Sequence, residues 1–450
     1  MREFRLVSTS GICGYGFPEE SLKAAMKREP HMIGVDGGST DPGPHYLGSG
    51  KCLNSRMAVK RDIALMMDAA LSARVPMVIS TCGGAGGEPH LQATAEIVHE
   101  IAREKGHKFK LALIHAEQPK SFVKEKLAKG KVKPLKAVPE LTAETVDKAS
   151  RIVGMMGPEP FIQALDNGAE IVLAGRDPAP WAACATRAQL PPAPAWFAGK
   201  LLECGATPSI PKGHDCLLAT VRDDHVIVEA LNPIRKCTPM SVANHSLHEN
   251  PSPCIHVEPG GVLDTTNCRF EAESDRAVRI SGMRWTPTPY TVKLEGAELA
   301  GYRTITMCGT RDPGLLGQWE SFLKTVRQNV TDKARAFGVE PDQYQLIFRV
   351  YGRDGVMGEW EPVSRSQSHE LGVLIEVVGK TQEIASAVLA IARVNALHTD
   401  FPGRLCKEGN MAFPFSPSDI DAGATYRFSV FHIVEDVDPL SMFPIEYQMV

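Results

Sequence analysis

Polar residues follow five short apolar segments in the first half of the sequence, and helical patterns separate these segments. Such alternation is typical of a parallel sheet covered by helices. The carboxyl ends of parallel strands meet at one edge of a sheet, and open α/β sheets bind ligands there, so we expect one shared site. The expected strands are Phe4–Val7, Met32–Val35, Pro76–Ile79, Lys110–Ile114 and Glu170–Ala174.

Acidic and imidazole side chains after two of these strands suit proton transfer. Asp36 and Asp41 follow the second strand, and His115 and Glu117 follow the fourth. Carboxylates and a histidine at one site could act as general acids and bases. They could also hold a divalent cation, which stays an open alternative, as do structural roles in capping or turns. We predict that His115, Glu117, Asp36 and Asp41 are catalytic.

Backbone amides and a guanidinium after the strands could bind an anion. The glycine-rich segment Ser80–Gly87 links a strand to a helix, where free N–H groups and the helix dipole favour negative charge. Its spacing matches neither the dinucleotide nor the Walker fingerprint. Arg176 could grip a carboxylate through two hydrogen bonds. The predicted substrate-binding residues are Ser39, Thr40, Gly83, Gly84, Gly86, Gly87, Arg176, Asp177, Glu203 and Cys204.

Other residues leave alternatives open. Cys204 could be a nucleophile, although no histidine adjoins it, and Cys82 keeps a thiol role in the glycine-rich segment open. Lys293 and Glu295 lie two positions apart on an expected strand, which favours a surface ion pair. The segment Tyr351–Gly355 could cover a cleft, but a plain hairpin turn is the preferred interpretation.

The periodicity predicts an α/β protein of three domains. Residues 1–212 would form an open, mostly parallel, doubly wound sheet that carries the ligand site. Residues 213–300 show period-two patterns and short turns, which indicate an antiparallel β segment. Residues 301–450 follow a β-α-β-β-α-β order, which is typical of ferredoxin-like α+β folds.

Two local predictions concern the connections in this scheme. Apolar spacing favours one helix over Ala143–Met155. Tyr290–Leu294 and Tyr302–Met307 are expected to be two separate strands that approach one another. The strands of the last third could alternatively extend the first sheet.

Composition excludes several function classes. The 450 residues carry a net charge of −4, so no basic surface for nucleic acid is expected. No apolar run approaches roughly 20 residues, and we expect no membrane span. The eleven cysteines show no Cys-x-x-Cys spacing, which indicates reduced thiols and a cytoplasmic location. Self-association into a homo-oligomer is expected for a large cytosolic enzyme.

Several segments, taken in order, resemble the acyclic terpene utilisation family of bacterial and fungal catabolic proteins. The resemblance covers most of the chain and implies a cytosolic enzyme of carboxylic-acid or acyl-thioester breakdown. It implies no settled reaction and no known set of catalytic residues. The segments that carry it are Asp36–Gly43, Gly83–Gly87, His115–Glu117, Gly168–Ala179, Leu202–Ala206 and Tyr290–Lys293, of which Gly168–Ala179 and Leu202–Ala206 are the most specific.

These observations together predict an enzyme that acts on a small carboxylate or an acyl thioester. A lyase of the hydratase/dehydratase or retro-aldol type is favoured, because it needs an anion anchor, a base and charge stabilisation. A hydrolase using the same groups is the nearest alternative. A non-catalytic subunit that binds acyl-CoA or another anion is the second class. A nucleotide-dependent oxidoreductase is disfavoured because the dinucleotide fingerprint is missing.

Overall fold

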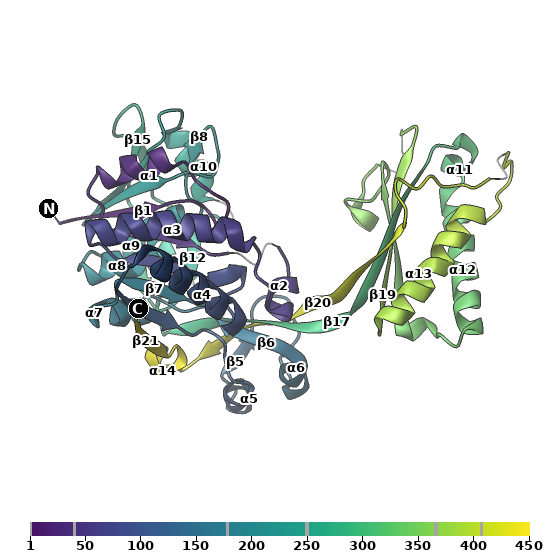
Figure 1. The fold of residues 1–450 in the computed structure, drawn as a ribbon, viewed down its shortest axis with the longest axis horizontal. Helices are drawn as coiled ribbons and strands as arrows, with labels where there is room; N and C mark the ends of the chain where they lie inside the picture. Colours follow the sequence, from purple (N-terminus) through teal and green to yellow (C-terminus); the bar gives the residue numbers. More distant parts are fainter. Residues whose placement is uncertain (1, 39–41, 177–179, 248–251, 364–367, 406–407) are drawn as a thin grey trace. The chain divides into compact units, whose positions relative to one another are not determined.

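The computed structural model describes residues 2–38, 42–176, 180–247, 252–363, 368–405 and 408–450. Ser39, Thr40, Asp41 and Asp177, which the sequence places at the site, lie outside the described residues. The chain forms two compact units, a larger one of Met1–Glu298 with Phe428–Val450 and a smaller one of Leu299–Arg427 (Figure 1). The division therefore differs from the three predicted domains.

The centre of the larger unit is a ten-stranded sheet in the order β14-β15-β10-β9-β1-β2-β3-β7-β4-β21. Strands β1, β2, β3, β7 and β4 are parallel neighbours, as the alternation of strands and helices predicts. Their carboxyl ends therefore meet at one edge. Their bounds are Glu3–Ser8, Met32–Asp36, Met77–Ser80, Ile171–Ala174 and Lys110–Ile114.

Antiparallel strands extend this sheet on both sides, and residues 213–298 of the expected antiparallel segment 213–300 belong to the larger unit. Each of the six residues of β1 has a partner in β9, which leaves β1 no open edge. Strands β9 and β10 form one hairpin, β14 and β15 form a second, and β10 pairs with β15 between them. On the other side of the sheet, β21 pairs with β4. These strands are β9 Leu217–Arg222, β10 His225–Ala230, β14 Arg269–Ala272, β15 Ala277–Ser281 and β21 Ile445–Met449.

Helices cover both faces of the sheet because successive strand residues point to opposite sides. Helices α3 (Arg56–Ala73) and α4 (Glu88–Lys105) bury Met66 and Val98 against one face. Helices α7, α8 and α9 bury Phe161, Trp181 and Trp196 against the other. Their bounds are Glu159–Asp166, Pro180–Arg187 and Pro192–Leu202.

Two connections differ from the sequence predictions. The helix expected over Ala143–Met155 ends early, as α6 Ala143–Lys148, and the chain continues as β6 Ala149–Gly154, which pairs with β17 and buries Ile152 and Val153. The two strands expected around Tyr290–Met307 form one continuous strand, β17 Thr291–Thr310, because β6 and β19 pair with its successive halves.

The remaining elements of the larger unit are short. They are α1 Glu19–Met26, α2 His45–Ser49, η1 Cys82–Gly84, α5 Lys120–Ala128, β5 Val132–Pro134, β8 Ser209–Ile210, β11 Lys236–Cys237, α10 Pro239–Ser246, β12 Ile255–Glu258, β13 Gly261–Asp264, β16 Arg284–Pro287 and α14 Pro439–Met442.

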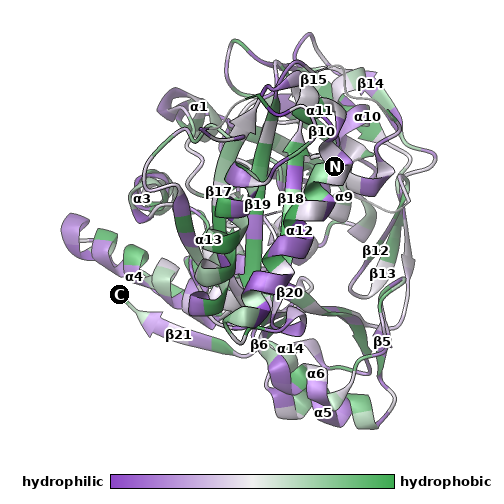
Figure 2. Cartoon of the chain, turned by 90° about the vertical axis from the view of Figure 1, so that its right-hand side faces the viewer, coloured by the Kyte–Doolittle hydropathy of each residue, from purple (hydrophilic) through white to green (hydrophobic). Residues whose placement is uncertain are grey.

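The smaller unit follows the predicted order of strands and helices. Its strands lie in the order β18-β19-β17-β20, and β19 is antiparallel to both β18 and β17. Helices α12 and α13 lie side by side over these strands (Figure 2), and Phe322, Val326, Ile375 and Leu389 form part of the core. The elements are α11 Pro313–Gly317, α12 Trp319–Ala336, η2 Pro341–Gln343, β18 Tyr344–Tyr351, η3 Gly358–Trp360, β19 Leu371–Gly379, α13 Gln382–His398 and β20 Asp419–Glu435.

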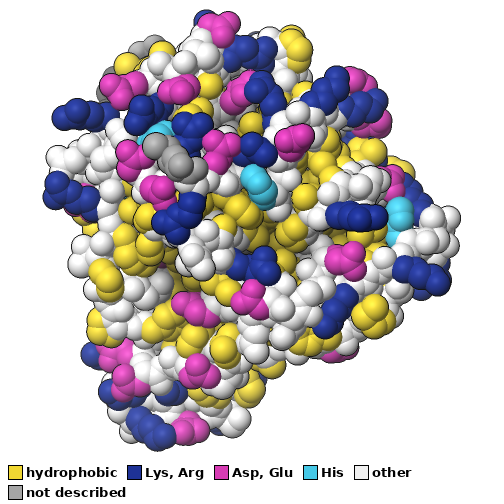
Figure 3. Space-filling model, turned by 90° about the vertical axis from the view of Figure 1, so that its left-hand side faces the viewer, with side chains coloured by type: hydrophobic (Ala, Val, Ile, Leu, Met, Phe, Trp, Pro, Cys, Tyr) yellow, Lys and Arg dark blue, Asp and Glu magenta, His cyan; other side chains and the backbone are white. Residues whose placement is uncertain are grey.

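The outer surface is of mixed charge. Figure 3 shows acidic and basic side chains interspersed over the face of the larger unit that it presents, without a large area of one sign. Among the helices that the structure describes, none has the length and apolarity needed to cross a membrane.

Glycines allow the carboxyl ends of the parallel strands to approach closely. A Cβ added to Gly38, after β2, would lie 2.2 Å from the Cα of Gly84, after β3. A Cβ added to Gly86 would lie 2.3 Å from the backbone nitrogen of Arg176, after β7. Both contacts join backbone to backbone, which a change of side-chain rotamer cannot relieve. The absence of side chains at these positions therefore sets the geometry of this edge.

Replacing Gly38 with alanine should lower the free energy of unfolding by about 3 kcal/mol or more, because the clash forces backbone to move. Urea unfolding monitored by circular dichroism measures this change. Gly317→Ala is the matched control, because nothing lies within 4 Å of the added Cβ. Equal midpoints for the two variants would show that the close approach of the strand ends is not required.

Candidate functional site

Strand alternation divides the predicted catalytic residues between the two faces of the sheet. Asp36 and Arg176 continue the side-chain positions of Met32 and Ala174, which face α8 and α9. His115 and Glu117 continue the positions of Leu111 and Leu113, which face α3 and α4. The strand ends meet at one edge, as predicted, but their acid–base side chains do not form a single group.

Asp36 lies in a charged and poorly hydrated environment. Its Oδ1 accepts hydrogen bonds from the Gly38 amide (3.2 Å) and the Ser80 hydroxyl (3.3 Å). Removal from water raises the pKa of Asp36 to about 7, with the negative charge of Glu203 adding to the effect and Arg176 opposing it. Asp36 can therefore exchange a proton close to neutral pH.

Arg176 forms a buried ion pair. Its Nε donates to Glu295 Oε2 at 3.0 Å, and Lys293 Nζ lies 2.5 Å from Glu295 Oε1. Burial opposes ionisation of Glu295, but Arg176 and Lys293 together hold its pKa below the ordinary value. The predicted ion pair of Lys293 and Glu295 is present, but the Glu295 side chain is only 2% exposed, so the pair does not lie on the surface as expected. The opposite side of the strand carries the core residues Val292 and Leu294, and Glu295 is buried because Arg176 and Lys293 contact it.

A second group of charges lies at the end of α9. Lys200 Nζ is 3.2 Å from Glu203 Oε1 and 3.8 Å from Glu258 Oε1. Burial raises the pKa of Glu258 to about 7, whereas Lys200 opposes this rise. Burial also opposes the charge of Lys200, but the two carboxylates hold its pKa above the ordinary value. Lys200 therefore stays protonated at neutral pH.

These residues form one electrostatically connected group. Glu203 acts on the pKa of both Asp36 and Glu258, and Arg176 acts on that of both Asp36 and Glu295. We call it the buried charged cluster; its members are Arg176, Glu258 and Glu295, which are buried, and Asp36, Lys200, Glu203 and Lys293, which are half-buried. The sequence prediction included Asp36, Arg176 and Glu203 but missed Lys200, Glu258, Lys293 and Glu295.

The cysteines beside the strand ends differ in their surroundings. Burial raises the pKa of Cys82 to about 12, so its thiol stays protonated and the structure gives it no nucleophilic role. Cys204 follows Glu203 and contributes to the electrostatic environment of Lys200. A Cβ added to Gly11 would lie 3.2 Å from the Cys204 carbonyl oxygen, so the end of α9 packs directly against the segment after β1.

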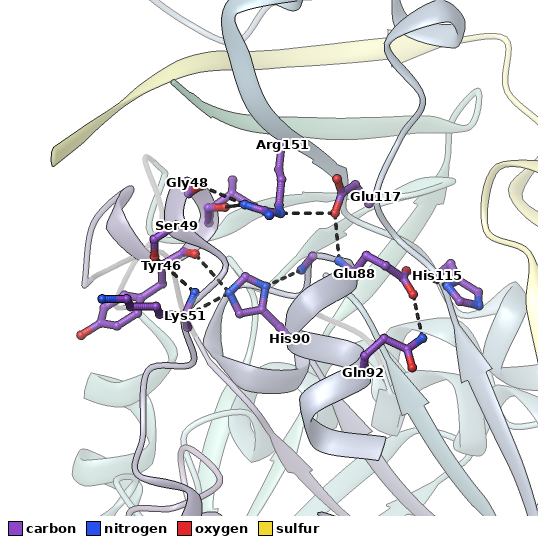
Figure 4. A network of polar contacts seen from close by, with 12 residues as sticks. Tyr46, Gly48, Ser49, Lys51, Glu88, His90, Gln92, His115, Glu117 and Arg151 are labelled. Carbon is purple, nitrogen blue, oxygen red and sulfur yellow. Dashed lines mark hydrogen bonds and ion pairs between the residues drawn. The ribbon is translucent and has the colours of Figure 1, made fainter. Parts of the chain in front are cut away.

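The predicted pair His115 and Glu117 contacts the first residue of α4 (Figure 4). His115 Nδ1 lies 2.8 Å from Glu88 Oε2, and Glu117 Oε2 accepts the Glu88 amide at 2.9 Å. Arg151 Nε lies 3.8 Å from the same oxygen of Glu117. Glu117 thus satisfies a free N–H at the start of the helix, which is a capping role.

Most backbone amides of the glycine-rich segment donate hydrogen bonds to other groups of the protein. Gly84 donates to the Thr81 carbonyl and Gly86 to the Cys82 carbonyl, each at 3.1 Å. Gly87 donates to His90 Nδ1 at 3.2 Å, and Gly83 accepts from the Leu53 amide through its carbonyl at 2.9 Å. The structure therefore does not present Gly84, Gly86 or Gly87 as donors to an anion, because tight turns and His90 already bind their N–H groups.

His90 holds the glycine-rich segment in place through three backbone groups (Figure 4). The Gly87 contact needs Nδ1 as an acceptor, and Nε2 lies 3.1 Å from the carbonyl oxygens of Tyr46 and Lys51, so it donates. The ring is thus neutral in this arrangement. Burial lowers the pKa of His90, which agrees with this assignment.

No group of three or more His, Cys, Asp and Glu side chains is placed to hold a metal ion within the part of the chain that the structure describes. In the buried charged cluster, Arg176, Lys200 and Lys293 already accompany the carboxylates. For Asp36, the cation that acts on the carboxyl group is Arg176.

The sequence of the chain matches the model of a known protein family. The family model described as "Acyclic terpene utilisation family protein AtuA" matches residues 58–209 and 224–412, which is most of the chain. The chain belongs to this family, which confirms the resemblance seen in the sequence. Neither the curated proteins nor the solved structures contain a significant match to it.

Protonation of His90 should destabilise the fold. Because its pKa is lowered in the folded state, the unfolded chain binds a proton more readily, and the free energy of unfolding should fall as pH drops below about 6.5. Urea unfolding between pH 5 and 8 measures this dependence. The variant His90→Gln should be less stable at pH 8 and should show a weaker pH dependence. An unchanged slope would remove His90 as its source.

Proposed function

We propose that this protein is a catabolic enzyme that acts on a small carboxylate or its acyl thioester, as a lyase of the hydratase/dehydratase or retro-aldol type. One observation supports this most: two carboxyl groups with pKa values raised to about 7, Asp36 and Glu258, belong to one cluster with three cations. A general acid or base works best when its pKa lies near the working pH.

The cluster offers the groups that such a reaction needs. In a dehydration, Asp36 or Glu258 would take a proton from the carbon next to the carboxyl group and return one to the leaving hydroxyl group. In a retro-aldol cleavage, it would take the proton of the β-hydroxyl group, the C–C bond would break, and the enolate carbon would receive a proton. Arg176, Lys200 and Lys293 would stabilise the negative charge that develops on an enolate. Lys200 stays protonated beside Glu203 and Glu258, which favours an electrostatic role over attack on a carbonyl carbon.

Two alternatives use the same cluster. A hydrolase would direct the carboxylate base at water instead of at carbon, and a binding subunit would use only the cations. Acid–base groups tuned close to neutral pH favour catalysis over binding alone, because a binding site gains nothing from a carboxyl group that shares its proton at neutral pH. Exchange of a substrate proton with solvent distinguishes proton abstraction at carbon from both alternatives.

We also propose a finer description of the two units. Helices on both faces of the parallel strands support a doubly wound sheet in the larger unit. The order β-α-β-β-α-β together with the strand order β18-β19-β17-β20 supports a ferredoxin-like smaller unit. A cytoplasmic location agrees with the scattered cysteines, as the sequence suggests.

Asp36→Asn should abolish proton exchange while the fold persists. The wild-type protein, incubated in D2O with a panel of small hydroxy acids and acyl-CoA thioesters, should exchange the proton next to the carbonyl of its substrate, as NMR detects. The rate should rise as pH passes through about 7 if Asp36 is the base. We expect a loss of 100-fold or more for Asp36→Asn, as is usual for removal of a general base, and a comparable loss for Glu258→Gln.

The surface variant Asp223→Asn is the matched control, because it removes a carboxylate that pairs with Arg2 at 2.9 Å, outside the cluster. It should exchange at the wild-type rate. Wild-type exchange in both cluster variants would eliminate Asp36 and Glu258 as the acid–base pair.

Glu117→Gln tests the other face of the sheet. Because Glu117 caps α4, the variant should lose about 1 kcal/mol of stability and keep its proton exchange within about threefold. Thermal unfolding and the same NMR assay measure the two quantities. Abolished exchange in a fully folded variant would instead assign the base to Glu117 and the α4 face.

A further inference from the structure

A groove in the smaller unit has the features of a second ligand site. It lies between α12 and the segment that follows β18, and its volume is about 830 Å3, within the range of small-molecule sites. Lys324, Arg327 and Gln328 line it from the helix, Phe348 from β18, and Val356 and Met357 from the following segment. The groove is independent of the buried charged cluster and does not rest on the proposed function.

The wall opposite α12 is a built structure and not the plain hairpin turn that the sequence favours. The amides of Arg353, Asp354 and Gly355 all reach the Val350 carbonyl, at 2.9–3.2 Å, and Gly358 donates to the Asp354 carbonyl at 2.7 Å. Arg353 Nη2 donates to Glu320 Oε1 on α12 at 2.5 Å, which ties this wall to the helix across the groove.

Lys324 and Arg327 line the groove without a close ion pair among the described residues, although the carboxylates Glu320, Asp354 and Glu359 also line it. No carboxylate of the described residues lies within 4 Å of the charged atoms of Lys324 or Arg327. Glu320, in contrast, pairs with Arg353, and Asp354 lies 3.6 Å from the same arginine. Arg327 donates to the Leu346 carbonyl at 2.8 Å and lies 4.9 Å from the centre of the Phe348 ring. Glu320 acts on Arg327 through space, but neither Arg327 nor Lys324 is held in an ion pair with a described residue, so both can still contact an anion in the groove.

Apolar side chains adjoin these cations. Val356 is 84% exposed and Met357 is 51% exposed, although both line the groove. The Phe348 ring adds an aromatic surface beneath Arg327. Exposed apolar groups beside a cation fit a ligand that carries both an apolar body and a negative charge. We propose that this groove binds an organic anion with a flat or apolar body, such as an aryl or acyl phosphate or carboxylate.

Isothermal titration calorimetry with 1-naphthyl phosphate as the probe tests the proposal. Two control ligands separate the two features of the probe: 1-naphthalenemethanol has the apolar ring without the charge, and inorganic phosphate has the charge without the ring. The full-length protein should bind the naphthyl phosphate at least tenfold more tightly than either, and added salt should weaken its binding. Absence of binding, or equal binding of the neutral analogue, would overturn the proposal.

Substitutions place the binding in the groove. The double variant Lys324→Gln with Arg327→Gln should bind the naphthyl phosphate at least tenfold more weakly. Arg335→Gln is the matched control on the same helix, because Arg335 pairs with Glu340 at 3.3 Å and does not line the groove. Should the double variant fail to fold, Lys324→Gln alone and the perturbation of backbone NMR signals by the probe replace it. Signal changes confined to residues outside α12, β18 and the segment 351–360 would refute the site.

Discussion

The ion pair between Arg176 and Glu295 sets the electrostatics of the whole strand-end region. Arg176 is the cation that acts on Asp36 and also the hydrogen-bond donor to Glu295, and both carboxyl groups are poorly hydrated. Removing one partner of a buried pair leaves an uncompensated charge, a loss of about 3–5 kcal/mol in comparable cases. Arg176 therefore supports the contact between the end of β7 and strand β17, and it limits how far the pKa of Asp36 can rise.

The arrangement of glycines explains how a large guanidinium reaches this position. The segments after β2, β3 and β7 approach one another at glycines, where no side chain separates the backbones. Gly86 lies next to the backbone nitrogen of Arg176. The segment Gly83–Gly87 serves as a spacer in which the amides of Gly84, Gly86 and Gly87 are bound by the carbonyls of Thr81 and Cys82 and by His90. Its glycines let the strand ends meet. A glycine-rich turn at the start of a helix is thus compatible with a structural role alone.

Much of the fold could be predicted from sequence because periodicity records burial directly. The parallel strands and helix Arg56–Ala73 follow from apolar spacing. The helix predicted over Ala143–Met155 failed because pairing with β17 overrides local preference after Lys148. The single sheet of the larger unit depends on contacts such as that of β1 with β9, which join residues far apart in the sequence and leave no local signal.

The sequence predicts where the candidate site lies, at the carboxyl ends of the parallel strands, but it does not predict which side chains come together there. Alternation along β4 puts His115 and Glu117 on the side of Leu111 and Leu113, opposite Asp36, a distinction available from strand parity once the strand bounds are known. Lys200 and Glu203 are spaced by three residues in a helix and could be paired from sequence. Glu258 comes from a separate small sheet, so only the folded chain brings it to Lys200.

The two faces of the sheet edge differ in whether their polar side chains are already bound to the start of a helix. On the α4 face, Glu117 accepts an amide, His115 pairs with Glu88, and His90 is bound at both ring nitrogens. Groups held in this way stabilise the start of a helix. On the α9 face, burial raises the pKa values of Asp36 and Glu258 to about 7, and the negative charge of Glu203 adds to the rise of both. Carboxyl groups held there have little reason to persist for stability, since an apolar residue would fill the same space without desolvating a charge. We therefore propose the α9 face, and not the α4 face, as the place for acid–base chemistry.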